Sequence, residues 1–181
     1  MNQMTPMLRQ YLSIKDEYPD SILFFRMGDF YEMFFDDAKI ASKILGITLT
    51  SRGSFNGEKV PMCGIPHHSS RSYIAKLIEK EWKVALCEQV EDPKASKGIV
   101  KREVVRVVTP GSVIEDGEVD SKTNLYIAAI AGGDTNYGVA HVDLSTGAFR
   151  VTEVEEWGEL FDELGRIGPS ELLIPESCHL S

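Results

Sequence analysis

Apolar residues form two strand-length runs, at 22–27 and 30–35, and only a Gly-Asp pair separates them. Apolar, aromatic runs of about six residues are typical of β-strands. A Gly-Asp pair favours a two-residue turn, because glycine readily adopts positive φ. The pattern therefore predicts a β-hairpin in which Phe30 follows the turn. Because side chains alternate along a strand, Phe30 and Glu32 share one face, about 6–7 Å apart.

Three segments of the first 90 residues have the apolar spacing or the end signals of helices. A capping Thr5-Pro6 begins the first helix, which ends at Tyr18-Pro19-Asp20; the second runs from Asp36 to Gly46, and the third begins at Ser69 or Ser70. Further strands are predicted at 47–50, 82–87 and 100–108. Glycine and proline predict a loop at 52–57 and a segment at 61–68 that is neither helix nor regular strand.

A second domain is predicted after Thr109-Pro110-Gly111 and the acidic run that follows it. The boundaries are 1–112 for the first domain, 113–120 for a linker and 121–181 for the second domain. The second domain shows three strands, a helix with Leu160, Phe161 and Leu164 as its core face, and a final strand; their ranges are 124–131, 137–144, 148–154, 156–166 and 171–174. The predicted fold class is α/β, with a mixed β-sheet flanked by helices.

The formal net charge of −9 is unevenly distributed along the chain. Residues 1–117 hold 16 basic and 16 acidic side chains, whereas residues 118–181 hold 3 basic and 12 acidic ones. Within 94–106, five basic residues accompany the single acid Glu103: Lys94, Lys97, Lys101, Arg102 and Arg106. Such a segment can neutralise phosphates whatever the total charge, and a solvated strand face is an equally good interpretation.

Phe30 and Glu32 have two interpretations at this point. An aromatic ring at the mouth of a turn can enter between base pairs, where unstacking costs least if a base is already mispaired. The pattern alone favours a buried Phe30 and a solvated Glu32, because phenylalanine is usually buried and glutamate usually exposed.

A series of sequence blocks shifts this balance, because together they resemble the mismatch-recognition domain of the MutS family of DNA repair proteins. The blocks occur in family order between residues 5 and 111: Thr5-Pro6-Met7, Gln10-Tyr11-Leu12, Phe30-Tyr31-Glu32, Asp36-Asp37-Ala38-Lys39, 61–68, Cys87-Glu88-Gln89-Val90, Ser96-Lys97-Gly98 and 104–111. Residues 118–181 fit the family's connector domain more loosely. That domain has a ribonuclease H-like fold whose sheet normally continues further, so we expect it to be incomplete here.

The resemblance implies a role for Phe30 and Glu32 in binding DNA. Phe30 would stack on the mispaired base from the minor groove, and Glu32 would form a hydrogen bond with that base. Met27 and Asp29 would flank this wedge. Further contacts to the duplex are implied for Arg52, Met62, His68, Lys97 and Arg102.

The resemblance also implies properties of the full-length protein. The family forms a homodimer that clamps DNA, uses ATP and Mg²⁺ in a domain far downstream, and recruits a MutL-type partner. Residues 1–181 contain no Gly-x₄-Gly-Lys-Ser/Thr loop, so we expect neither catalysis nor a cofactor in this segment.

Two other function classes are weighed against this one: a metal-dependent nuclease of ribonuclease H type and a plain protein-interaction module. A nuclease needs clustered carboxylates, and the strand at 124–131 has none. The spacing of Cys63, His67 and His68 does not match a zinc site. Three widely spaced cysteines and no apolar run of membrane-spanning length predict a reduced, cytoplasmic protein. The family resemblance, with both Phe30 and Glu32 present, implies a bacterial one.

Overall fold

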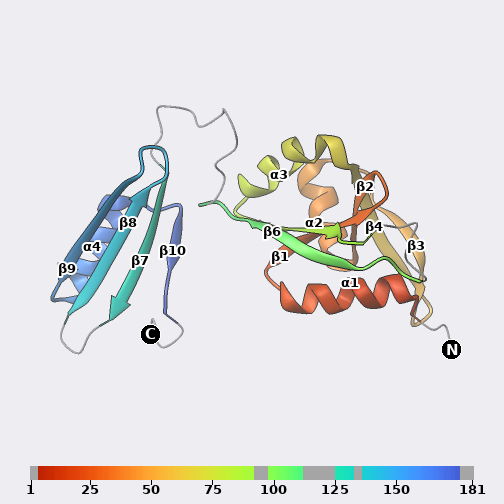
Figure 1. The fold of residues 1–181 in the computed structure, drawn as a ribbon, viewed down its shortest axis with the longest axis horizontal. Helices are drawn as coiled ribbons and strands as arrows, with labels where there is room; N and C mark the ends of the chain where they lie inside the picture. The colour runs from red at the N-terminus through yellow and green to blue at the C-terminus, as the bar shows by residue number, and fades with distance from the viewer. Residues whose placement is uncertain (1–3, 92–97, 112–124, 133–135, 176–181) are drawn as a thin grey trace. The chain divides into compact units, whose positions relative to one another are not determined.

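The computed structural model describes residues 4–91, 98–111, 125–132 and 136–175. The chain divides into two compact units between Thr109 and Pro110, and each unit combines a mixed β-sheet with α-helical structure (Figure 1). The predicted α/β class is therefore confirmed. The predicted linker at 113–120 lies outside the described residues.

The first unit contains a six-stranded sheet in the order β3-β4-β2-β1-β5-β6. Strands β1 and β5 are parallel and all other neighbours are antiparallel. Along the chain the elements are α1 (Pro6–Glu17), β1 (Ser21–Met27), β2 (Phe30–Phe34), α2 (Phe35–Leu45), β3 (Thr50–Phe55), β4 (Glu58–Pro66), the 3-10 turn η1 (His67–Ser69), α3 (Ser70–Ile78), β5 (Lys83–Gln89) and β6 (Arg102–Val108).

Helix α1 packs on one face of this sheet, and α2 and α3 cover the other (Figure 1). The end signals behave as the sequence predicts: Thr5 caps α1 by accepting a hydrogen bond from the Leu8 amide, and Gly46 ends α2 with φ of 68°. The predicted helices and the β1–β2 hairpin are confirmed to within a few residues.

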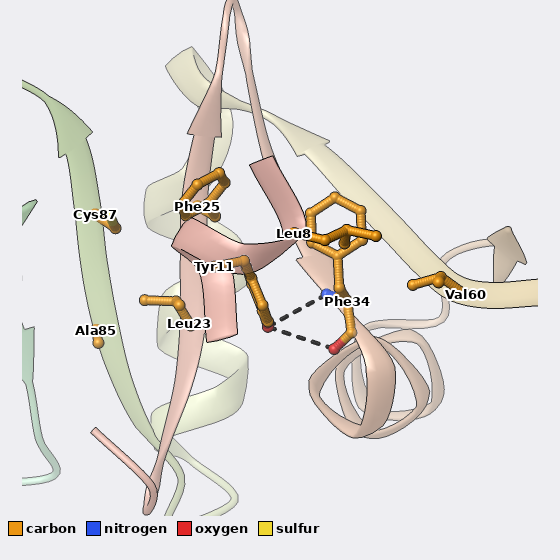
Figure 2. Packing of buried hydrophobic residues seen from close by; sticks show 8 residues of the cluster. All are labelled: Leu8, Tyr11, Leu23, Phe25, Phe34, Val60, Ala85 and Cys87. Atoms are coloured by element: carbon orange, nitrogen blue, oxygen red, sulfur yellow. Dashed lines mark hydrogen bonds between the residues drawn. The ribbon is translucent and has the colours of Figure 1, made fainter. Parts of the chain in front are cut away.

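Tyr11 anchors α1 to the sheet, where its ring contacts Phe25 and Phe34 edge to face (Figure 2). Its hydroxyl lies 3.3 Å from both the backbone nitrogen and the carbonyl oxygen of Phe34, and it donates to the Asp37 carboxylate at 2.9 Å. Burial, and then the charge of Asp37, raise the pKa of the Tyr11 hydroxyl well above its usual range. The face of β2 that carries Phe34 is therefore tightly covered at the end far from the turn.

The β3–β4 hairpin corrects three predictions. The strand predicted at 47–50 is wrong except for Thr50, and the segments 52–57 and 61–68, predicted to be irregular, lie largely within β3 and β4. Asn56 and Gly57 form the turn, both with positive φ, and Asn-Gly is itself a strong hairpin signal. Pro61 is tolerated because the β3 register shifts beside it, as at a β-bulge.

The second unit is a four-stranded sheet in the order β10-β7-β8-β9, with one helix packed on it. Strand β10 is parallel to β7, and the other neighbours are antiparallel. The elements are β7 (Tyr126–Gly132), β8 (Tyr137–Asp143), β9 (Ala148–Val154), α4 (Trp157–Ile167) and β10 (Glu171–Leu173).

The core face of α4 differs by one residue from the prediction. Leu160 and Ile167 are buried and Leu164 packs beside them, whereas Phe161 is 57% exposed. The reason is helical spacing: 160, 164 and 167 form one stripe, and residue 161 lies about 100° around the helix from it. In the part of the chain that the structure describes, no helix is long and apolar enough to cross a membrane.

Candidate nucleic-acid interface

The β1–β2 hairpin ends in a two-residue turn that is fixed at both sides. Met27 pairs with Phe30 across the turn, and Gly28 adopts φ of 60°. A Cβ at Gly28 would meet no atom within 4 Å, so the backbone conformation, and not a lack of space, calls for glycine. The Asp29 carbonyl accepts a hydrogen bond from the His67 amide at 2.8 Å, which ties the turn to η1.

Phe30 is the exception among the aromatic residues of this hairpin. Its side chain is 49% exposed, whereas Phe24, Phe25 and Phe34 are completely buried. Phe34 and Phe30 share one face of β2, but α1 covers only the Phe34 end. Exposure therefore rises along this face toward the turn, and the Phe30 ring lies at the uncovered end.

Glu32 lies between these two phenylalanines and pairs with Arg52. The Arg52 Nη1 donates to both carboxylate oxygens of Glu32, at 2.7 and 2.6 Å. Arg52 follows Ser51 in the irregular part of β3, where a β-bulge can redirect a side chain away from regular alternation. The structure thus brings together two residues of the predicted site that are 20 positions apart.

A polar cluster on the opposite face supports the hairpin, and the sequence reasoning gave no role to its members. The Tyr31 hydroxyl donates to Glu88, whose carboxylate also lies 3.7 Å from Arg26 Nη1 and 3.8 Å from His67 Nε2. Burial, and then the hydrogen bond to Glu88, raise the pKa of Tyr31. His67 and Glu88 lie in blocks that carry the family resemblance, which was the only signal available for them.

Comparison with known families gives two matches that together cover most of the chain. Residues 5–117 match the family model described as MutS domain I, and residues 125–181 match the one described as MutS domain II. The chain belongs to the MutS family.

Individual MutS relatives agree with the family models. The DNA mismatch repair protein MutS of Desulfatibacillum aliphaticivorans is 55% identical over 174 residues, that of Pelotomaculum thermopropionicum 56% over 172 residues, and that of Staphylococcus haemolyticus 52% over 174 residues. These alignments cover 96%, 93% and 96% of this chain but 20% of each relative. The chain therefore spans about a fifth of the length of these MutS proteins.

Arg102, a DNA-contact candidate from the MutS resemblance, has a buried side chain in this structure. The residue is 8% exposed, and its guanidinium lies 4.8 Å from the centre of the Phe25 ring. Its Nε donates to the Arg26 carbonyl at 2.7 Å, and its Nη1 donates to the Gln10 side chain and the Val100 carbonyl at 3.0 and 2.9 Å. These bonds join α1, β1 and β6, so the geometry favours a structural role over contact with phosphate.

The remaining candidates of the MutS resemblance lie in different surroundings. Met62 is opposite Phe34 in the sheet and packs against the α1 core, away from the turn. His68 is exposed in η1. It lies two residues after Pro66, which pairs with Phe30. Lys97 lies outside the described residues.

The structure also bears on the metal interpretations considered from the sequence. The Cys63 side chain is buried on the α2 side of the sheet, where it lies 3.4 Å from the Ala38 carbonyl, so it does not face solvent with His68. Among the described residues, no group of three or more His, Cys, Asp or Glu side chains is arranged to hold a metal ion.

Proposed function

We propose that this chain binds mismatched double-stranded DNA, with Phe30 as a wedge that stacks on the mispaired base from the minor groove. The observation that carries the proposal is the half-exposed Phe30 ring at the end of a hairpin whose other phenylalanines are buried. If Phe30 were only a core residue, we would expect its ring to be buried like those of the other phenylalanines of the hairpin. Membership of the MutS family indicates that the ligand of this exposed ring is mismatched DNA, because domain I is the mismatch-recognition domain of the family.

The energetics of wedge insertion favour a mispaired site. Separating two stacked base pairs costs a few kcal/mol, and a mispaired base has already lost part of that stabilisation. Stacking of a base on an aromatic side chain returns about 1–3 kcal/mol. The same wedge is therefore close to balanced at a mismatch and unfavourable in a fully paired duplex.

Glu32 adds discrimination through its charge and its hydrogen-bonding capacity. It lies two residues behind Phe30 on the same face of β2, within reach of a base stacked on the ring. Its carboxylate can bond a base edge that a kinked site exposes, whereas phosphates of an ordinary duplex repel it. Met27 and Asp29 flank the wedge at the turn.

The basic and polar contacts to the duplex backbone come from residues around the hairpin. Arg52 on β3 and His68 in η1, which follows β4, are both exposed, and Lys97 belongs to the same group by resemblance alone. We leave Met62 and Arg102 out of the proposed interface, because the side chain of Met62 packs on the core and that of Arg102 is buried.

The second unit and the full-length protein complete the proposal. Three antiparallel strands, a helix and a fourth strand parallel to the first support a ribonuclease H-like connector domain. In the full-length protein we propose a homodimer, an ATP- and Mg²⁺-dependent domain outside this chain, and a MutL-type partner. Residues 1–181 then contribute recognition and no catalysis.

Binding of matched and mismatched duplexes, measured by fluorescence anisotropy, tests the proposal. In a full-length MutS protein that carries this chain as its N-terminal segment, we expect a preference for the mismatched duplex that Phe30→Ala abolishes. For the 181-residue chain alone we expect affinity in the nonspecific range of about 10⁻⁴–10⁻⁶ M. Equal binding of both duplexes by the full-length protein would reject the proposal, and cleavage of DNA by the chain in Mg²⁺ would favour a nuclease.

A further inference from the structure

The ion pair between Glu32 and Arg52 occupies two residues that the proposed function assigns to DNA. Both carboxylate oxygens of Glu32 already accept a hydrogen bond from Arg52 Nη1. The Glu32 side chain is 14% exposed and that of Arg52 is 47% exposed, so the arginine lies on the solvent side of the pair. A base that approaches Glu32 therefore meets a carboxylate that is already bonded.

The residues opposite Glu32 on the two neighbouring strands explain how Arg52 reaches the carboxylate while its own side chain stays half exposed. Gly64 is opposite Glu32 in β4, and a Cβ at Gly64 would lie 3.6 Å from Glu32 Cγ. Because glycine has no side chain, the β4 position directly opposite Glu32 leaves room for the Arg52 side chain to reach the carboxylate from β3. On the other neighbouring strand, Phe25 is opposite Glu32 and is covered by the buried Arg102. Burial lowers the pKa of Arg102, and the charge of Glu32 acts in the opposite direction, so Glu32 interacts electrostatically with both arginines.

We propose that Arg52 is a positioning residue that exchanges partners during recognition. Arg52 holds Glu32 in the free protein and on matched DNA, and it transfers to a backbone phosphate when Glu32 bonds a mispaired base. The inference rests on the proposed function and adds to it a competition within the protein. A guanidinium binds carboxylate and phosphate with similar geometry, so the exchange replaces one charge-assisted bond with another.

Simple charge neutralisation predicts that Arg52→Ala weakens the matched and the mismatched complex equally, whereas the exchange predicts that the two are weakened unequally. On matched DNA, Arg52 offsets the repulsion between Glu32 and the phosphates, so Arg52→Ala lowers affinity through both the lost cation and the bare carboxylate. On mismatched DNA, Glu32 has the base as its partner, so the same substitution removes only a phosphate contact. Arg52→Ala should therefore weaken both complexes yet raise the preference for the mismatch about fivefold, which corresponds to about 1 kcal/mol.

The test is a double-mutant cycle in a full-length MutS protein that carries this chain as its N-terminal segment. Anisotropy titrations with matched and mismatched duplexes compare wild type, Arg52→Ala, Glu32→Ala and the double variant. Without Glu32, Arg52→Ala should weaken both complexes by the same factor. Lys59→Ala is the charge-matched control: Lys59 is an exposed residue of β4, and its loss should leave the preference unchanged. Arg52→Lys keeps the cation and should return the preference toward that of wild type.

The outcomes separate this inference from the proposed function. If Arg52→Ala weakens both complexes equally whether or not Glu32 is present, the exchange is wrong and Arg52 only neutralises phosphate. The proposed function then still stands if wild type prefers the mismatch and Phe30→Ala removes that preference. If wild type shows no preference at all, both are overturned. About half of the Arg52 side chain is exposed, so the unfolding curves of the variants should coincide with that of wild type. If Arg52→Ala fails to fold, Arg52→Gln, which also removes the cation, takes its place in the cycle.

Discussion

We expect that replacing Arg102 with alanine mainly lowers the stability of the first unit, and that any change in DNA affinity is secondary. The substitution removes four hydrogen bonds from a charged donor, to the Arg26 carbonyl, the Gln10 side chain, the Val100 carbonyl and the Met27 sulfur. It also removes the guanidinium that lies 4.8 Å from the centre of the Phe25 ring. The MutS resemblance implied a contact between Arg102 and the duplex, so this prediction separates that interpretation from a structural role.

The magnitude follows from what the substitution leaves behind. A hydrogen bond to a charged group contributes about 1.5–3 kcal/mol, and a buried acceptor without its donor costs about 1–3 kcal/mol. A cation–π contact adds about 0.5–2 kcal/mol. These contributions overlap, because all of them belong to one side chain, so we expect a loss of about 3–5 kcal/mol for Arg102→Ala. A domain of this size is stable by about 5–15 kcal/mol, so the variant should be close to unfolding.

Urea unfolding of the 181-residue chain, followed by circular dichroism, measures this loss as a lower midpoint at an unchanged slope. Arg106→Ala is the matched control, because Arg106 lies on the same strand and is exposed; we expect a change within about 0.5 kcal/mol. If Arg102 instead met a phosphate, Arg102→Ala would weaken matched and mismatched complexes alike and reduce the salt slope by about one unit. Such a result, together with an unchanged unfolding midpoint, would refute the structural role.

Three further predictions follow from the hairpin and from the buried thiols. Phe30→Ala should abolish the mismatch preference and cost only about 1 kcal/mol in stability, because Phe30 is half exposed. Phe34→Ala on the same face of β2 should cost about 3–5 kcal/mol, because Phe34 is buried. A large drop in melting temperature for Phe30→Ala with retained mismatch preference would contradict the wedge. Glu32→Gln should bind matched duplex more tightly and reduce the preference for mismatched over matched DNA, because it removes a charge near phosphates and releases Arg52. An unchanged affinity for matched duplex across a salt series would place Glu32 away from DNA. Burial raises the pKa of the Cys63 thiol to about 11 and that of Cys87 to about 12, from an ordinary 9.0, so both stay protonated in the folded chain to higher pH than in the unfolded one. The contribution of the two protonated thiols to stability is therefore complete below pH 9 and is lost as the pH rises from 9 through the raised pKa values. Urea unfolding at pH 10 should show a free energy of unfolding lower than at pH 7 by about 1 kcal/mol per thiol. Equal midpoints at the two pH values would contradict this prediction.

The sequence by itself determined the features that depend on neighbours within a few residues. The Gly-Asp turn, the alternation that places Phe30 and Glu32 on one face, and the Thr5-Pro6 start of α1 are all local, and the structure confirms each of them. Turn chemistry and capping act over two to four positions, so their signals survive without knowledge of the fold. The family blocks also pointed to MutS, which the comparisons confirm.

Only the tertiary structure decided which side chains are covered and which find partners. No local pattern distinguishes the exposed ring of Phe30 from the buried one of Phe34, because the difference is where α1 ends on the sheet. Arg102 meets Gln10 across 92 positions, and Arg52 meets Glu32 across 20. Both arginines are cations in polar segments of the sequence, yet one is buried and the other is exposed. Their surroundings depend on how distant elements pack, because burial and partner choice arise from contacts between elements and not from the order of residues within one.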